Sequence, residues 1–245
     1  MNIALFTNTY LPHVGGVARS VSVYAKMYRE LGHRTLVFAP EFEGEFEDDE
    51  EVVRLPAITN FNNSGFSVRL PSPVMIGDAL DEFQPDVIHS HHPFLVGDAA
   101  LRVAYARELP LVFTHHTLYE QYTNYLPFHG DFTQRAAATL ATAYANACDL
   151  IFAPSQSLAK LIIERGVESP VVVQPTGVDL PFFAGGDGAG FKAERGIGED
   201  VFVLGHVGRL ALEKNLRYLC EAVCDFLKKR DDVAFVIVGS GDEEE

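Results

Sequence analysis

The sequence predicts a doubly wound α/β fold, in which helices cover both faces of a parallel β-sheet. Apolar runs rich in valine, isoleucine and leucine recur along the chain, and helix-like stretches separate them. Strands that are apolar throughout, rather than alternately apolar and polar, are typical of sheets buried on both faces. The chain has 245 residues, of which 47% are hydrophobic, so it can bury a substantial core.

The expected strands and helices alternate along most of the sequence. Eight apolar runs are the expected strands: residues 3–6, 35–39, 87–89, 111–114, 150–153, 171–173, 201–207 and 234–238. Five stretches with helical spacing lie among them: residues 17–31, 98–107, 132–147, 157–165 and 215–229. Turn residues support these boundaries, since Ser155 or Ser157 can cap the fourth helix and Gly166 can close it.

A glycine-rich segment, residues 181–200, divides this pattern into two parts. It has few periodic apolar residues and a new strand follows it, so we expect a linker between two domains. Residues 1–180 are expected to form a first Rossmann-like domain. Residues 201–245 supply a strand, a helix and a strand, too little to close the core of a doubly wound domain. We therefore expect an incomplete start of a second Rossmann-like domain, which would continue beyond residue 245.

The formal charge of −15 is concentrated in two short acidic stretches. Eight acids lie between residues 41 and 51, and residues 242–245 are all acidic. Without these twelve residues the chain has 22 acids and 19 bases, a nearly neutral balance. The first acidic stretch is expected to be a solvated loop. The sequence contains no basic stripe to neutralise phosphates, which argues against nucleic-acid binding.

The hydropathy pattern and the cysteines indicate the expected compartment. No stretch approaches the ~20 apolar residues that cross a bilayer, and the N-terminus lacks the basic and apolar segments of a signal peptide. We expect a cytoplasmic protein. The three cysteines form no CxxC pair, so they indicate neither a disulfide framework nor a zinc site. Cys220 and Cys224 share the apolar stripe of the helix at 215–229, and we expect both in the core.

The residues that follow each strand are the first candidates for a site, because open α/β sheets bind ligands beyond the carboxyl ends of their strands. After the first strand, Gly15 and Gly16 open a helix. Glycines there let backbone N–H groups approach an anion at the helix N-terminus. The alternative is a plain turn that requires positive φ. The spacing is not GxGxxG, so it does not predict a dinucleotide site.

Five histidines lie at the ends of the third and fourth expected strands or directly after them. On an extended strand His89 and His91 share one face while His92 lies on the other, which does not match the spacing of metal ligands. Neutral hydrogen-bonding roles are therefore favoured over a metal site. His115 and His116 follow residues 111–114, and only one of them can face a cleft above the sheet because successive side chains alternate.

Residues 205–215, GHVGRLALEKN, have the features of a diphosphate site in the second domain. The strand ends at Val207, Gly208 gives close access to the backbone, and Arg209 and Lys214 flank a short turn before a helix. Two fixed cations beside a helix N-terminus suit a diphosphate. The alternative is a pair of ordinary surface cations.

Together these residues resemble the retaining glycosyltransferases of family 4, which have the two-domain GT-B fold. The resemblance rests on six elements: residues 15–16 (GG), 86–89 (DVIH), 114–116 (THH), 175–179 (PTGVD), 208–215 (GRLALEKN) and 236–242 (VIVGSGD). It implies an enzyme that transfers a sugar from a nucleotide-sugar donor, such as UDP-glucose, to an acceptor hydroxyl with retention of configuration. It also implies that no cofactor and no essential metal are needed.

The resemblance assigns roles to individual residues. Gly15 and Gly16 would contact the donor diphosphate, and His116 would act beside the transferred sugar. Arg209 and Lys214 would both bind the donor and stabilise the leaving diphosphate, because preorganised cations lower the barrier for its departure. The family's paired-glutamate motif belongs to the part of the second domain beyond residue 245. We therefore expect no turnover by the 245-residue chain alone.

Residues 114–126, THHTLYEQYTNYL, resemble a segment of bacterial diacylglycerol glucosyltransferases. This likeness implies a lipid acceptor such as diacylglycerol, with a sugar as the alternative. His89, His91, Tyr119 and Tyr122 are the acceptor-side candidates.

A lipid acceptor implies peripheral contact with the inner face of the cell membrane. The basic residues that hint at such a surface lie around the first helix: Arg19, Lys26, Arg29 and Arg34. Two other function classes stay open. One is a nucleotide-sugar epimerase of the same fold, although no paired carboxylates stand at the strand ends to move a carbon-bound proton. The other is a non-catalytic nucleotide-binding or interaction module.

Overall fold

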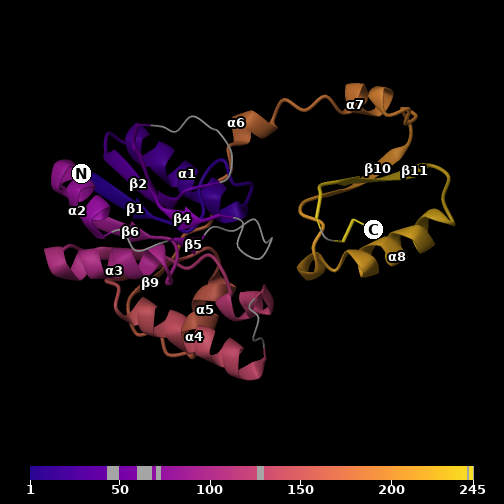
Figure 1. Ribbon diagram of the computed structural model, residues 1–245. Coiled ribbons are helices and arrows are strands. Elements are labelled where there is room, and N and C mark those ends of the chain that lie inside the picture. The colour runs from indigo at the N-terminus through magenta and orange to yellow at the C-terminus, as the bar shows by residue number, and fades with distance from the viewer. Residues whose placement is uncertain (43–49, 60–67, 70–72, 126–129, 242, 245) are drawn as a thin grey trace. The chain divides into compact units, whose positions relative to one another are not determined.

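The computed structural model describes residues 1–245 except 43–49, 60–67, 70–72, 126–129, 242 and 245. Most of the first acidic stretch therefore lies outside the described residues. The chain divides into two compact units, Met1–Val178 and Asp179–Glu245 (Figure 1).

The first unit is built on a seven-stranded sheet whose strands all run parallel. Its order is β3-β2-β1-β6-β7-β8-β9. The strands are β1 (Asn2–Phe6), β2 (Arg34–Pro40), β3 (Val52–Leu55), β6 (Val87–Ser90), β7 (Leu111–Thr114), β8 (Leu150–Ala153) and β9 (Val171–Val173). Leu5 of β1 pairs with Val37 on one side and His89 on the other, so the direction of winding reverses between β1 and β6. The predicted α/β class is confirmed, and this reversal is where such sheets bind ligands. A separate antiparallel pair joins β4 (Ala57–Ile58) to β5 (Val68–Arg69).

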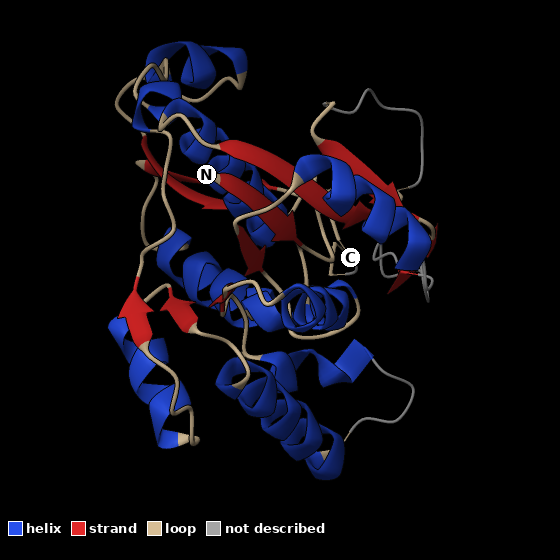
Figure 2. Ribbon diagram, turned by 90° about the vertical axis from the view of Figure 1, so that its left-hand side faces the viewer, coloured by secondary structure: helices blue, strands red, loops and turns tan. Residues whose placement is uncertain are grey.

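Helices lie on both sides of this sheet (Figure 2). They are α1 (Gly16–Glu30), α2 (Pro73–Phe83), α3 (Val96–Arg107), α4 (Asp131–Asn146) and α5 (Gln156–Glu164), with a 3₁₀ helix, η2, at Tyr119–Tyr125. Successive strand residues point to opposite faces, so Leu5 packs with α1 in one core while Phe6 packs in the other. The core with Phe6 is the larger one and includes side chains of α2, α3, α4 and α5. The expected helices of this unit are present, and α2, β3, β4, β5 and η2 are additional elements.

The second unit contains two parallel strands that are connected by a helix. Its elements are α6 (Leu180–Phe183), α7 (Gly188–Glu194), β10 (Phe202–Val207), the 3₁₀ helix η3 (Leu212–Lys214), α8 (Leu216–Leu227) and β11 (Val233–Val238). The predicted linker, residues 181–200, thus holds two short helices, and Asp179 and Asp187 cap them.

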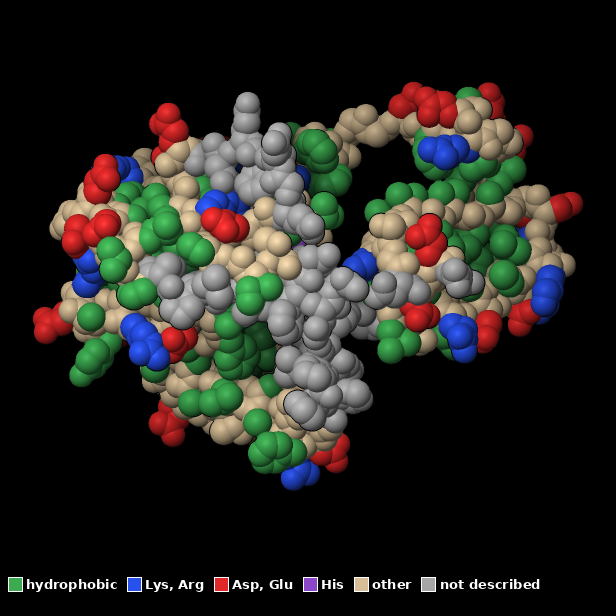
Figure 3. Space-filling view, viewed as in Figure 1, with side chains coloured by type: hydrophobic (Ala, Val, Ile, Leu, Met, Phe, Trp, Pro, Cys, Tyr) green, Lys and Arg blue, Asp and Glu red, His purple; other side chains and the backbone are tan. Residues whose placement is uncertain are grey.

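Large apolar side chains are exposed on the second unit (Figure 3). They include Phe202, Val207, Leu212 and Tyr218. The expectation that Cys220 and Cys224 lie in the core is wrong for Cys224, which is exposed, and Cys220 is half-buried. The apolar stripe of their helix is covered in part, since Leu216 is buried and Leu219 and Val223 are half-buried.

Candidate functional site

Asn8, in the loop after β1, makes three hydrogen bonds to the loop after β6 and the start of α3. The side-chain oxygen of Asn8 accepts a hydrogen bond from the backbone N–H of Val96 at 3.0 Å, and its amide donates to the carbonyl of Phe94 at 3.1 Å. Its own backbone N–H donates to Nδ1 of His92 at 3.1 Å. Asn8 therefore provides a hydrogen-bond acceptor for a backbone N–H in the first turn of α3. It also holds the two loops together at the carboxyl edge of the sheet.

Gly15 and Gly16 stand at the N-terminus of α1. Gly15 is the N-cap residue with φ −164° and ψ 154°, and neither glycine has positive φ. The alternative of a turn that needs positive φ is therefore wrong. No side chain caps this helix, and a Cβ added at Gly16 would meet nothing within 4 Å. An anion can thus approach the first-turn N–H groups, although contact with a donor diphosphate stays a prediction.

His89 is buried between the sheet and α1. Its Nε2 lies 2.7 Å from the hydroxyl of Thr114, and its Nδ1 lies 3.3 Å from the hydroxyl of Tyr28. The ring of Tyr24 packs edge-on at 5.2 Å between centroids. Both ring nitrogens have protein partners, so His89 acts as an internal hydrogen-bonding group, and its contact with an acceptor stays a prediction.

His91 and His116 come from the ends of neighbouring strands and meet through their rings. Nδ1 of His91 lies 2.9 Å from Nε2 of His116, with the ring centroids 5.2 Å apart and the planes 23° from parallel. His91 is completely buried, whereas His116 is half-buried. Of this pair, only His116 is accessible to a ligand, so His91 would reach an acceptor only through His116.

His115 and His116 separate as the alternation rule predicts. The ring of His115 lies 5.5 Å from Phe113 and 5.4 Å from Tyr119, inside the larger core, while His116 lies beside His91. The backbone N–H of His115 donates to the carbonyl of Phe152 at 2.9 Å.

Burial holds this group of histidines in the neutral form. Loss of solvation lowers the pKa of His89 to about 3 and the pKa of His116 to about 4, in each case with a smaller contribution from a neighbouring histidine. The same cause lowers the pKa of His91 well below its usual value. At neutral pH these rings therefore form hydrogen bonds without carrying a charge.

Tyr119 begins the 3₁₀ helix that follows β7. Its ring packs against Phe94 at 5.5 Å, and its hydroxyl is buried with no hydrogen-bond partner among the described residues. Burial raises the pKa of this hydroxyl. The backbone of Tyr122 belongs to the same helix, but its side chain and that of Tyr125 lie outside the described part of the structure. The acceptor roles of Tyr119 and Tyr122 stay predictions.

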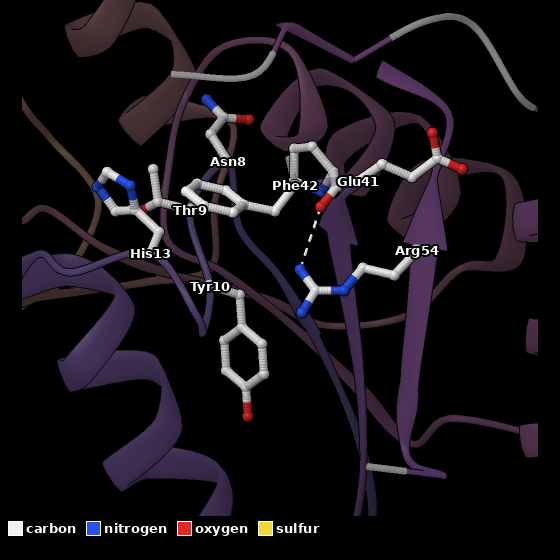
Figure 4. Close-up of a pocket in the computed structure, with 8 residues that line it drawn as sticks. Asn8, Thr9, Tyr10, His13, Glu41, Phe42 and Arg54 are labelled. Carbon is white, nitrogen blue, oxygen red and sulfur yellow. Dashed lines mark hydrogen bonds between the residues drawn. The ribbon is translucent and has the colours of Figure 1, made fainter. Parts of the chain in front are cut away.

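A pocket opens at the carboxyl ends of β1, β2 and β3 (Figure 4). Mostly polar and aromatic residues line it: Asn8, Thr9, Tyr10, His13, Pro40, Glu41, Phe42 and Arg54. The guanidinium of Arg54 donates to the carbonyls of Pro40, at 3.1 Å, and Leu11. The ring of His13 meets that of Phe42 at 5.6 Å. Arg54 was not a candidate from sequence, because a single arginine on a short strand has no recognisable pattern.

In the second unit, Arg209 and Lys214 lie between β10 and α8, and both are exposed. Lys214 ends the 3₁₀ turn, and Asn215 in the left-handed conformation, φ 50°, leads into α8 without a side-chain cap. The predicted strand, turn and helix are therefore present. Whether the two cations bind a diphosphate stays a prediction.

Two glycines, Gly239 and Gly241, let the loop after β11 pack closely against the turn that carries Arg209. A Cβ at Gly239 would lie 1.8 Å from the carbonyl oxygen of Gly208, and one at Gly241 would lie 2.1 Å from that of Leu210. Any other residue at either position would clash with backbone. The backbone N–H of Gly208 donates to the carbonyl of Val238 and that of Leu210 donates to Ser240, both at 2.9 Å.

Sequence reasoning missed the residues that hold the histidines. Thr114, Tyr24 and Tyr28 contact His89. Thr114 belongs to the THH element, but nothing in the sequence indicated its contact with His89, and the two tyrosines gave no signal because tyrosine is common at helix surfaces. Within the described residues, no three His, Cys, Asp or Glu side chains are arranged to hold a metal ion. The helices of the described part are all too short or too polar to cross a membrane.

Known families match the chain on both units. The family model described as Glycosyltransferase Family 4 matches residues 14–182, which include α1, the histidines and the whole sheet except β1. The chain belongs to Glycosyltransferase Family 4. A second family model, Glycosyl transferases group 1, matches residues 190–245, which include Arg209 and Lys214.

Several curated glycosyltransferases are similar to this family 4 chain. The alpha-monoglucosyldiacylglycerol synthase of Acholeplasma laidlawii is 29% identical over 98% of this chain and 64% of its own length. The GDP-mannose-dependent alpha-mannosyltransferase of Corynebacterium glutamicum is 29% identical over 99% of this chain and 58% of its own length. The chain thus spans about three fifths of the length of these relatives.

Solved structures show the same fold. The sucrose-phosphate synthase of Thermosynechococcus elongatus aligns over 97% of this chain and 70% of its own with a TM-score of 0.65 and 15% identity. A UDP-GlcNAc 2-epimerase from Neisseria meningitidis aligns over 97% of this chain and 65% of its own with a TM-score of 0.60 and 15% identity. These likenesses establish a GT-B type, Rossmann-like fold. Since transferases and an epimerase share it, the fold alone does not separate the two activities.

Proposed function

We propose that the complete protein transfers a sugar from a nucleotide-sugar donor to an acceptor hydroxyl, with retention of configuration. The observation that carries this proposal is the turn between β10 and α8, where Arg209 and Lys214 flank the uncapped N-terminus of a helix within a segment that matches Glycosyl transferases group 1. Departure of a nucleoside diphosphate builds negative charge on its phosphates. Fixed cations and helix N–H groups stabilise that charge in the transition state.

The first unit would supply the groups around the transferred sugar. His116 is half-buried and neutral, and Gly16 leaves the N-terminus of α1 open. A neutral imidazole can hydrogen bond to sugar hydroxyls, and its lowered pKa makes it a weak base. Membership of Glycosyltransferase Family 4 favours transfer over epimerisation.

The acceptor that we propose is a lipid hydroxyl, such as that of diacylglycerol. Two relatives that match this chain over 98% of its length are named alpha-monoglucosyldiacylglycerol synthases, in Acholeplasma laidlawii and Streptococcus pneumoniae. We further propose that the protein works in the cytoplasm, at the inner face of the membrane, without a cofactor or an essential metal. The similar mannosyltransferases leave both UDP-glucose and GDP-mannose as donors to be tested.

The proposal is tested by a transfer assay on the complete protein. Labelled UDP-glucose or GDP-mannose would be incubated with diacylglycerol vesicles in EDTA, and the product's anomeric configuration read by NMR. We expect an α-linked glycolipid from one of the two donors. An epimerised nucleotide sugar in place of a glycolipid, or binding without any chemical change, would contradict the proposal.

A further inference from the structure

His91 is buried with one of its two ring nitrogens unpaired. Nδ1 lies 2.9 Å from Nε2 of His116, whereas Nε2 has no hydrogen-bond partner among the described residues. The ring has no exposed surface, and it packs against His89 at 4.2 Å and Tyr24 at 5.5 Å between centroids. Because only one of the two ring nitrogens has a hydrogen-bond partner, the position of the single ring proton can be inferred.

A neutral imidazole carries one proton, on either Nδ1 or Nε2. If the proton of His91 were on Nε2, a buried N–H would lack an acceptor while Nδ1 accepted from His116. If the proton is on Nδ1, only a lone pair is left unpaired. Buried N–H groups without acceptors are rarer than acceptors with an unused lone pair, because the lost donor bond is the costlier of the two. His91 therefore donates from Nδ1 to Nε2 of His116.

We propose that His91 is a positioning residue that fixes His116 as the Nδ1–H tautomer, so that His116 presents a hydrogen-bond donor to a ligand oxygen. Nε2 of His116 accepts from His91, so the single proton of the neutral ring must be on Nδ1. His116 is half-buried, and that N–H is the group left to meet a ligand. The pKa of each ring is lowered by burial, which keeps both neutral. Only the identity of the ligand, an oxygen of a sugar substrate, rests on the proposed function.

Histidine ¹⁵N NMR on the protein tests this directly, because the two tautomers give different nitrogen shifts and couplings. We expect His91 and His116 both to carry their proton on Nδ1. In His91→Gln no group remains at the place of Nδ1, so His116 should move toward the Nε2–H tautomer that histidine favours in water. The matched control is His89→Gln, which removes the neighbouring buried imidazole without touching His116 and should leave its tautomer unchanged.

Two results would overturn the proposal: an Nε2–H signal for His116 in the unmodified protein, or an unchanged His116 tautomer in His91→Gln. If His91→Gln does not fold, the spectrum of the unmodified protein still decides. The measurement needs no donor and no turnover, so it is independent of the transfer assay. In the complete protein, His91→Gln should lower kcat by roughly three- to tenfold, the worth of one hydrogen bond, with nucleoside diphosphate binding unchanged.

Discussion

The histidines at the ends of β6 and β7 are neutral because the fold removes them from water. Burial brings the pKa of His89 to about 3 and the pKa of His115 and His116 to about 4. In the unfolded chain the same side chains titrate near 6.5. Protons therefore bind the unfolded state first as the pH falls, so stability is full above about pH 6.5 and is lost progressively toward pH 4.

We predict a steep loss of folding free energy over this range. Each buried histidine should contribute a slope of about 1.4 kcal/mol per pH unit between its unfolded and folded pKa. Denaturant titrations at several pH values, followed by tyrosine fluorescence, would measure it in the first unit, since eight of the nine tyrosines lie before residue 179. His89→Gln should reduce this slope of unfolding free energy against pH by about the contribution of one histidine. A flat stability between pH 6.5 and 4 would contradict the burial of these rings.

Part of this residue-level arrangement is predictable from sequence. The separation of His115 from His116 follows from the alternation of side chains along one strand, which is a local property. The hydrogen bonds of His91 to His116 and of His89 to Thr114 join β6 to β7. Such contacts depend on strand order and register, which the local pattern does not specify. The positive φ expected in one interpretation of Gly15 and Gly16 is absent, because an extended N-cap opens α1 instead.

At the scale of elements, the apolar runs located the strands because strands buried on both faces are apolar throughout. Two of the elements that the sequence did not predict, α2 and β3, lack that signal. The helix α2 begins at Pro73 and contains Gly77, which weakens its helical pattern, and β3 is four residues long and directly follows the acidic stretch. Helix propensity and strand length are both weak predictors when neighbouring elements decide the outcome.

The start of α3 offers a test of how its loops are packed. A Cβ at Gly97 would lie 1.7 Å from the carbonyl oxygen of His92, whereas one at Gly77 in α2 would meet nothing within 4 Å. Gly97→Ala should therefore destabilise the first unit by at least ~1 kcal/mol, the scale of overpacking. Gly77→Ala should be neutral or stabilising by up to about 1 kcal/mol, since alanine favours helices. Equal unfolding free energies for the two variants would show that α3 does not approach the loop this closely.

At the scale of the whole molecule, alternating strands and helices were enough to predict two Rossmann-like parts. The class is a property of the entire pattern, so it tolerates errors in single elements. The proposed contact with a membrane is different, because it depends on which cations are exposed on the surface. Arg29 donates to Thr35 at 2.6 Å and pairs with Glu51, while the Lys26 side chain is 63% exposed.

We predict that the complete protein binds vesicles that contain anionic lipid, more weakly at high salt. Lys26→Glu should weaken this binding by about fivefold or more, since a lysine near such a surface contributes ~1 kcal/mol. Lys160→Glu is the matched control, because Lys160 is also exposed and also pairs with a glutamate four residues on, at 3.8 Å against 3.9 Å for Lys26. Co-sedimentation would measure both. An equal loss of vesicle binding in the two variants would mean that another surface contacts the lipid, or that binding depends only on the net charge of the protein.

The central claim is that the turn between β10 and α8 binds the diphosphate of a nucleotide sugar. Calorimetry of the complete protein with UDP-glucose and GDP-mannose tests it most directly. The Arg209→Ala, Lys214→Ala double variant should bind at least about tenfold more weakly, because hydrogen bonds to charged groups contribute roughly 1.5 to 3 kcal/mol each. Lys228→Ala, Lys229→Ala removes the same charge from the end of α8 and should bind as the unmodified protein does. Unchanged affinity in the first variant, or the same loss in both, would contradict the claim.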